Sequence, residues 1–182
     1  MTFALYRQEK AIFTFDDYGA LLEECRRRNA NRVLEFGPGI STLALVEAGC
    51  GAILTCEYND RWFNSANELF KGQPSVSLLR YRNDSEVSVE GLRPDDQFDL
   101  AFVDSPIGMP GHAVRHPGQE DCSRLNTVLF ALQRAPVVLL HDAKRPGERM
   151  TLNRVAASGH AVSMIETRKG IARIERTVAD GA

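Results

Sequence analysis

Short apolar runs alternate with segments of helical periodicity along most of the chain. The apolar runs predict strands, because strands that are buried on both faces show few polar positions. These runs cover residues 32–36, 52–57, 76–79, 98–103 and 136–140. Segments in which apolar residues recur every three or four positions predict helices. They cover about residues 18–28, 41–49, 59–71, 122–133 and 148–157.

The order of these segments predicts the fold class. Strands that alternate with helices form βαβ units, which build a parallel sheet with helices on both faces. Two alternating runs near the end, 161–167 and 171–176, flank a tight turn and predict an antiparallel hairpin. We therefore predict an α/β protein with a doubly wound, mostly parallel seven-stranded sheet and a C-terminal antiparallel hairpin. We expect one domain over residues 1–182, in which an N-terminal arm and helix (1–30) precede the core (31–182).

Composition and charge narrow the class of protein. The 182 residues carry 22 Lys and Arg against 24 Asp and Glu, a formal charge of −2. Proteins that grip nucleic acid or an anionic membrane need a basic excess. No apolar run approaches the roughly 20 residues of a membrane span, and the first residues lack the pattern of a secretory signal. We expect a cytoplasmic protein without a nucleic-acid or membrane partner.

Candidate chemistry follows the first two predicted strands. Gly37 and Gly39 come directly after the first strand and permit a tight turn, and Ser41 can cap the helix that follows. Glu57 ends the second strand, 20 residues after Gly37. A carboxylate at this spacing binds the ribose hydroxyls of nucleoside ligands in α/β proteins. Together the turn and the acid predict a nucleoside-binding site.

The details of the turn separate two kinds of nucleoside ligand. A dinucleotide site needs a third glycine in the pattern G-x-G-x-x-G, and the chain has Thr42 at that position. Glu35 stands two residues before Gly37. Its negative charge would repel a pyrophosphate and favour a cationic ligand such as an ammonium or a sulfonium. An NAD-dependent oxidoreductase is therefore disfavoured, although it stays an alternative.

These residues resemble the class I S-adenosylmethionine-dependent methyltransferases, which have a Rossmann-like core. The resemblance is carried by residues 34–43, by Cys56-Glu57, by residues 98–104 and by the hairpin. Ser41 stands where many members have a further glycine. The resemblance implies S-adenosylmethionine as the cofactor. It also implies a set of cofactor-binding residues: Glu35, Gly37, Gly39 and Ser41 at the methionine part, Glu57 at the ribose, Tyr58, Asp84 and Ser85 near the adenine, and Asp104 near the methionine amine.

The acceptor side of the pocket is expected beyond the next two strands. Asp104 follows the strand 98–103, and His141 and Asp142 follow the strand 136–140. Methyl transfer from a sulfonium is an in-line displacement, for which an enzyme positions the acceptor and removes its proton. We predict His141 as the base, because its ordinary pKa lies near neutrality, with Asp104 and Asp142 orienting it. A divalent metal held by these three residues is a second, less favoured arrangement.

Residues 105–119 are rich in Gly, Pro and His and predict a long loop at this pocket mouth, which we expect to form a substrate lid. His112 and His116 in the loop could join Cys122 and His141 in a zinc site. The prolines of the loop argue against the helix that this histidine spacing would suit, so zinc is disfavoured.

A narrower resemblance concerns the acceptor. The run FVDSP, Arg124 and the run VVLLHDAKRP are similar to the methyltransferase-like domains of polysaccharide biosynthesis, some of which O-methylate glucuronic acid. This resemblance implies that Arg124, Lys144 or Arg145 pairs with an acceptor carboxylate. The predicted function is S-adenosylmethionine-dependent O-methylation of a small molecule or sugar, with a homodimer left open. The alternatives are the NAD-dependent oxidoreductase and a non-catalytic module that binds S-adenosylmethionine.

Overall fold

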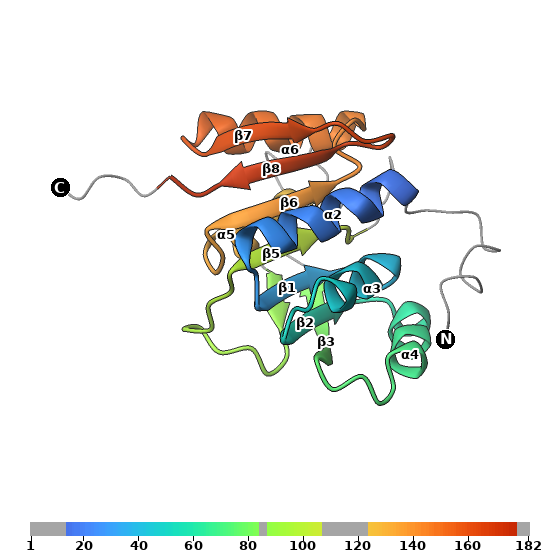
Figure 1. Cartoon of the computed structure of the whole chain (residues 1–182). Helices are drawn as coiled ribbons and strands as arrows, with labels where there is room; N and C mark the ends of the chain where they lie inside the picture. The colour runs from blue at the N-terminus through green and yellow to red at the C-terminus, as the bar shows by residue number, and fades with distance from the viewer. Residues whose placement is uncertain (1–13, 84–86, 107–123, 178–182) are drawn as a thin grey trace.

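Helices and strands alternate along the chain as the apolar pattern predicts (Figure 1). The structure is a computed structural model that describes residues 14–83, 87–106 and 124–177. Within these ranges the helices are α2 (Phe15–Arg28), α3 (Ile40–Glu47), α4 (Asp60–Leu69), α5 (Leu125–Leu132) and α6 (Pro146–Ala157). The strands are β1 (Arg32–Phe36), β2 (Ala52–Glu57), β3 (Val76–Asn83), β4 (Val87–Val89), β5 (Leu100–Val103), β6 (Val137–His141), β7 (Ala161–Ile165) and β8 (Ile171–Glu175). None of these helices is long and apolar enough to cross a membrane.

The strands form one sheet in the order β4-β3-β2-β1-β5-β6-β8-β7. The central neighbours from β3 to β6 run parallel, and β8 runs antiparallel to both β6 and β7. The predicted doubly wound, mostly parallel sheet with a C-terminal antiparallel hairpin is confirmed. The structure adds an eighth strand, because β3 continues past residue 79 to Asn83 and pairs there with the antiparallel β4.

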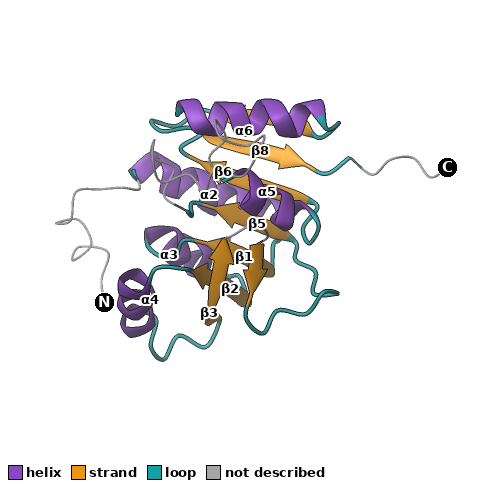
Figure 2. Ribbon diagram, turned by 180° about the vertical axis from the view of Figure 1, so that it is seen from behind, coloured by secondary structure: helices purple, strands orange, loops and turns teal. Residues whose placement is uncertain are grey.

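Helices cover both faces of the sheet (Figures 1 and 2), and alternate residues of the central strands pack against opposite helix layers. Val33 and Leu139 pack with residues of α2 and α3, whereas Leu34 and Leu140 pack with residues of α5 and α6. Helix α4 contacts β2 and β3. Because side chains alternate along a strand, Glu35 of β1 and His141 of β6 are directed to the same face as Val33 and Leu139.

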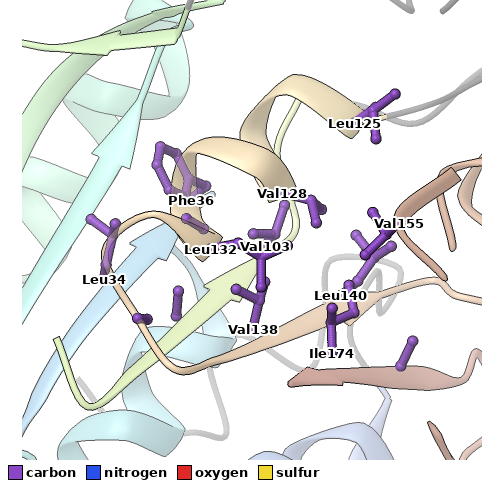
Figure 3. Packing of buried hydrophobic residues seen from close by; sticks show 14 of the residues in the cluster. Leu34, Phe36, Val103, Leu125, Val128, Leu132, Val138, Leu140, Val155 and Ile174 are labelled. Atoms are coloured by element: carbon purple, nitrogen blue, oxygen red, sulfur yellow. The ribbon is translucent and has the colours of Figure 1, made fainter. Parts of the chain in front are cut away.

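The larger core lies between the sheet and helices α5 and α6. Figure 3 shows Phe36 and Val103 from neighbouring strands beside Val128 of α5, and Ile174 of β8 near Val155 of α6. Each fully buried side chain of this kind stabilises the fold by about 1.5–3 kcal/mol. This packing fixes β1, β5 and β6 relative to one another, and with them the residues just past their carboxyl ends.

The strand order reverses between β1 and β5. From β1 the chain proceeds to β2 and β3 on one side, and it returns to the other side of β1 with β5 and β6. Open α/β sheets bind ligands outside the carboxyl ends of the strands at such a reversal. The residues that follow β1 and β5 meet there, since a Cβ atom on Gly37 would lie 3.1 Å from Cβ of Ser105. The predicted cofactor turn and Asp104 therefore lie side by side at the strand reversal, where we expect the ligand crevice.

Candidate functional site

The turn after β1 leaves open room above its second glycine. Gly37 has a φ of +96°, and an added Cβ would also lie 3.2 Å from the carbonyl carbon of Asp104. An L side chain is disfavoured there by its backbone conformation and by contact with the chain after β5. A Cβ on Gly39, in contrast, would meet no atom of the described residues within 4 Å. The turn thus packs against the protein at Gly37 and faces free space at Gly39.

Glu35 holds the first turn of α3 in place. Its buried carboxylate accepts hydrogen bonds from Ser41 Oγ and Thr42 Oγ1, both at 2.6 Å. Thr42 Oγ1 in turn accepts from the backbone N–H of Gly39 at 2.9 Å. Burial raises the pKa of Glu35 to about 7. The two hydrogen bonds favour the charged form and oppose this rise, but burial has the larger effect. Glu35 and Ser41 therefore fix the conformation of the glycine turn from the buried side. Gly39 lies on the opposite side of the turn, next to the open space.

Glu57 lies at the carboxyl end of β2 and is 5% exposed. Its Oε1 accepts a hydrogen bond of 2.8 Å from the backbone N–H of Asn59. Burial raises the pKa of Glu57 to about 6, and the hydrogen bond from Asn59 opposes that shift. A buried carboxylate is stabilised when a ligand donates hydrogen bonds to it in place of water. The two hydroxyl groups of a ribose are such donors.

Tyr58 offers an aromatic ring next to Glu57. Its side chain is 38% exposed, and its ring meets the ring of Tyr81 edge-on with centroids 5.6 Å apart. Tyr81 is buried, and its hydroxyl group is hydrogen-bonded to Ser105 Oγ at 2.7 Å. Tyr81 therefore supports the ring of Tyr58 from the protein side. Asp84 and Ser85, the other two residues predicted near the adenine, lie outside the described residues.

Six ionisable side chains meet at the carboxyl ends of β5 and β6, and we call them the charge cluster. They come from both helix layers and from both strand ends: Asp17 of α2, Asp104 after β5, Arg124 before α5, His141 and Asp142 at the end of β6, and Glu148 of α6. Asp104 is the most exposed of the six, at 17% of its side chain, against 2% or less for the others.

His141 lies between two carboxylates in the charge cluster. Its Nδ1 is 2.9 Å from Asp104 Oδ1 and its Nε2 is 3.3 Å from Asp17 Oδ2, while Asp142 Oδ2 is 3.7 Å from Nδ1. Burial alone would lower the pKa of His141, but the three carboxylates outweigh it and raise the pKa to about 9. His141 is thus an imidazolium at neutral pH, whereas the sequence led us to expect a neutral base. Its full burial also keeps the ring away from an acceptor in the crevice.

Asp17 is held by several donors besides His141. It accepts from the backbone N–H of Thr14 at 3.0 Å and from Thr167 Oγ1 at 2.5 Å, and it also accepts from the hydroxyl group of Thr14. Burial would raise the pKa of Asp17, but His141 and these hydrogen bonds keep it below its usual value. This carboxylate therefore stays charged and joins the start of α2 to the end of β6.

Arg124 is buried within the charge cluster. Its Nη2 lies 3.2 Å from Asp104 Oδ1 and 3.5 Å from Asp142 Oδ2. Its Nε donates to the carbonyl oxygen of Pro106 at 2.7 Å, and its Nη1 donates to the carbonyl oxygen of His141 at 3.0 Å. The side chain is 2% exposed. This geometry differs from the expected role of Arg124 at an acceptor carboxylate, because the guanidinium already faces the protein's own acceptors.

The charges around Asp104 keep its carboxylate ionised. Burial would raise the pKa of Asp104, but the positive charges of His141 and Arg124 outweigh that effect and hold it below its usual range. Glu148, which is fully buried 3.5 Å from Arg124 Nε, has its pKa raised by burial against the opposing charge of Arg124. Asp104 is therefore a charged hydrogen-bond acceptor that reaches the crevice.

Arg145 lies at the rim of the charge cluster. Its Nη1 is 2.8 Å from Asp142 Oδ2, and its side chain is 36% exposed. Lys169 Nζ lies 3.8 Å from Asp142 Oδ1. Lys144, in contrast, donates to the carbonyl oxygen of Thr167 at 2.6 Å and pairs with Glu166. Of the three basic residues predicted for the acceptor, Arg145 is the one that combines contact with the cluster and exposure.

Sequence reasoning missed two members of the charge cluster. Asp17 caps the start of α2 by accepting from the backbone N–H of Thr14, but its contact with His141 joins residues far apart in the chain. Glu148 was one acidic residue in a helical segment and carried no distinguishing pattern. His112, His116, Cys122 and most of the expected lid lie outside the described residues.

Comparisons with known proteins support the fold. No protein-family model matches the chain, and no curated protein matches its sequence. Among solved structures, the chain is similar to a putative caffeoyl-CoA O-methyltransferase from Staphylococcus aureus, with a TM-score of 0.69 and 14% identity over 97% of this chain and 93% of the other. It is also similar to the O-methyltransferase TomG from Streptomyces achromogenes, solved with S-adenosylmethionine, with a TM-score of 0.66 and 18% identity over 96% and 86%.

A third similar structure is a putative RNA methyltransferase from Pyrococcus horikoshii, with a TM-score of 0.58 and 15% identity over 88% of this chain and 84% of the other. These similarities show that the chain has the α/β fold of class I S-adenosylmethionine-dependent methyltransferases. The fold alone does not select an acceptor, since functions reside in sites that differ among proteins of one fold.

The pKa of His141 predicts a pH dependence of stability. A histidine whose pKa rises from 6.5 to about 9 on folding contributes its full stabilisation below pH 6.5 and loses it as the pH rises through 9. We expect the free energy of unfolding, measured by urea denaturation from pH 6 to pH 10, to fall by up to about 1.4 kcal/mol per pH unit through this window. His141→Gln should flatten this slope.

His160 supplies the control for this experiment. It lies outside the charge cluster, between α6 and β7, so His160→Gln should keep the slope of the wild type. Equal slopes in the wild type and His141→Gln would contradict the assignment of a buried imidazolium. Asp17, Asp104 and Asp142, the carboxylates that face His141, are present in all three proteins.

Proposed function

We propose that the protein transfers a methyl group from S-adenosylmethionine to an oxygen atom of a small-molecule acceptor. The observation that carries this proposal is the juxtaposition of the glycine turn and the buried Glu57 at the strand reversal. The similar structures named as O-methyltransferases, one of them solved with S-adenosylmethionine, support the choice of cofactor and of oxygen.

The residues of the crevice fit this cofactor. The free space above Gly39 can take the methionine part beside the first turn of α3. Glu57 can accept hydrogen bonds from the ribose hydroxyls, and the exposed ring surface of Tyr58 can pack against the adenine. Glu57 brings negative charge to the crevice, which favours a ligand with an ammonium and a sulfonium. When bound, the cofactor supplies an electrophilic methyl group.

On the acceptor side, we assign the contact with the acceptor to Asp104. Its carboxylate is the most exposed of the charge cluster and is kept ionised by His141 and Arg124. It can accept a hydrogen bond from an acceptor hydroxyl group and orient its oxygen toward the methyl group. His141 then acts as a positioning residue, because it holds Asp104 through Nδ1 without reaching the crevice. Arg145 at the rim is the basic group available to an acidic acceptor.

The size and charge of the chain favour a small acceptor over a nucleic acid. A formal charge of −2 provides no basic surplus for phosphate contacts. We also propose that the protein is cytoplasmic, that it forms a homodimer and that its chain is a single domain. We propose further that residues 105–119 form a substrate lid.

Glu57→Gln tests the cofactor half of the site. We expect calorimetry to show that the wild type binds S-adenosylhomocysteine and that the variant loses about 1.5–3 kcal/mol of binding free energy, because a charged acceptor of hydrogen bonds is replaced by a neutral one. That loss corresponds to roughly a tenfold to hundredfold rise in Kd. Glu68→Gln, which removes an exposed carboxylate from α4, should leave Kd unchanged.

The raised pKa of Glu57 adds a second readout to the same experiment. As the pH falls through about 6, Glu57 gains a proton in the unliganded protein and loses acceptor capacity. The affinity of the wild type should therefore fall below pH 6, and the affinity of Glu57→Gln should change less. No binding by the wild type would reject the proposed function, and NAD that competes with S-adenosylhomocysteine would favour an oxidoreductase.

Asp104→Asn tests the acceptor half. With tritium-labelled S-adenosylmethionine and a panel of phenols, aliphatic alcohols and sugar acids, the wild type should label at least one acceptor. Asp104→Asn should reduce kcat/KM for that acceptor by roughly a hundredfold or more, because it removes the charge that orients the hydroxyl group. Asp95→Asn, an exposed change away from the strand ends, is the matched control. Cofactor binding with no labelled product across the panel would favour a non-catalytic binding module.

A further inference from the structure

Three side chains of the charge cluster have the composition of a divalent-metal site. One ligand atom from each of Asp104, His141 and Asp142 lies within 4.8 Å of the others, and these three form the only such group in the described parts of the chain. Two carboxylates and an imidazole suit several divalent cations. By residue type alone, these three side chains could therefore bind a divalent cation.

The space between the two carboxylates is already approached by the protein's own nitrogens. Arg124 Nη2 lies 3.2 Å from Asp104 Oδ1 and 3.5 Å from Asp142 Oδ2. His141 Nδ1 lies 2.9 Å and 3.7 Å from the same two oxygens. A divalent cation binds carboxylate oxygens at about 2.0–2.6 Å. A metal placed between these oxygens on the side of Arg124 would therefore be repelled by a guanidinium that stays charged.

Arg124 is fixed in this position by more than its ion pairs. Its Nε and Nη1 donate to the carbonyl oxygens of Pro106 and His141. Its backbone has a φ of +59°, an uncommon conformation for a residue with a side chain. The surrounding contacts hold a strained residue in place, as occurs at functional sites. For a metal to enter, the guanidinium would have to leave these carbonyl groups while buried.

We propose that Arg124 is the built-in cation of the acceptor site and takes the place of a divalent metal between Asp104 and Asp142. The inference rests on the geometry of the charge cluster and goes beyond the proposed methyl transfer. Arg124 keeps Asp104 ionised and oriented, so it is a positioning residue. The wild type then binds no metal at this place, and removal of the guanidinium opens a latent site between the two carboxylates.

The test uses Mn²⁺ as the probe and measures binding by electron paramagnetic resonance of the free ion. We expect the wild type to bind no Mn²⁺ at this site at millimolar concentrations. Arg124→Met keeps a side chain of similar length without the charge, and we expect it to bind one Mn²⁺ per chain. Asp104→Asn added to Arg124→Met should abolish that binding, which locates the ion between the carboxylates.

Arg145→Met is the matched control. Arg145 also contacts Asp142 Oδ2, at 2.8 Å, but it lies at the rim. Its removal leaves Arg124 in place, so this variant should remain free of Mn²⁺. Binding by Arg145→Met equal to that of Arg124→Met would overturn the proposal, since the effect would then come from overall charge. A folded Arg124→Met that binds no Mn²⁺ would also overturn it.

A measurement on the wild type keeps the proposal testable if Arg124→Met does not fold. The Tm of the wild type should be the same in 2 mM EDTA and in 2 mM MnCl₂. A rise in Tm with MnCl₂ that Asp104→Asn abolishes would identify a metal site in the wild type and overturn the proposal. These readouts need neither cofactor nor acceptor, so their failure is distinct from a failure of the proposed methyl transfer.

Discussion

The imidazole of His141 lies between Asp104 and Asp17, and its contact with Asp17 joins helix α2 to the end of β6, which the sheet alone does not connect. Asp17 belongs to the first turn of α2, Asp104 follows β5, and His141 ends β6. Buried charges destabilise a protein strongly unless each has a partner. The pairing therefore requires α2 to lie with its first turn at the carboxyl edge of the sheet. Thr167, which donates to Asp17, adds the hairpin to this arrangement.

The half of the crevice that we propose for the cofactor and the half that we propose for the acceptor differ in how their charges are balanced. In the cofactor half, burial raises the pKa values of Glu35 and Glu57 to about 7 and about 6. In the acceptor half, His141 and Arg124 hold the pKa of Asp104 below its usual range. A ligand that carries positive charge gains more in the first half, where no Lys, Arg or His of the described residues forms an ion pair with Glu35 or Glu57. The second half needs no external cation, which leaves Asp104 available to a neutral hydroxyl group.

Most of the fold could be predicted from the sequence, because the central strands are buried on both faces and their apolar runs are continuous. Strand β4 was missed because Val87–Val89 is too short for an alternating pattern and pairs only through the extension of β3. The places of Gly37 and Glu57 at strand ends could be predicted, because both stand at the end of an apolar run. The roles of Asp17 and Arg124 could not, since both depend on which distant groups the fold brings within 4 Å.

The protonation of His141 shows why a residue type alone is a weak guide to chemistry. An isolated imidazole titrates near neutrality and suits a base. Here the carboxylates that we had expected to orient that base surround the ring and raise its pKa to about 9. The residue type is an equally weak guide for Arg124. Its planar guanidinium has five N–H donors and can donate to carbonyl groups and to carboxylates at the same time. It donates to the carbonyl group of Pro106 while it neutralises Asp104. One side chain therefore fixes both the charge of the acceptor site and the path of the chain that leaves β5.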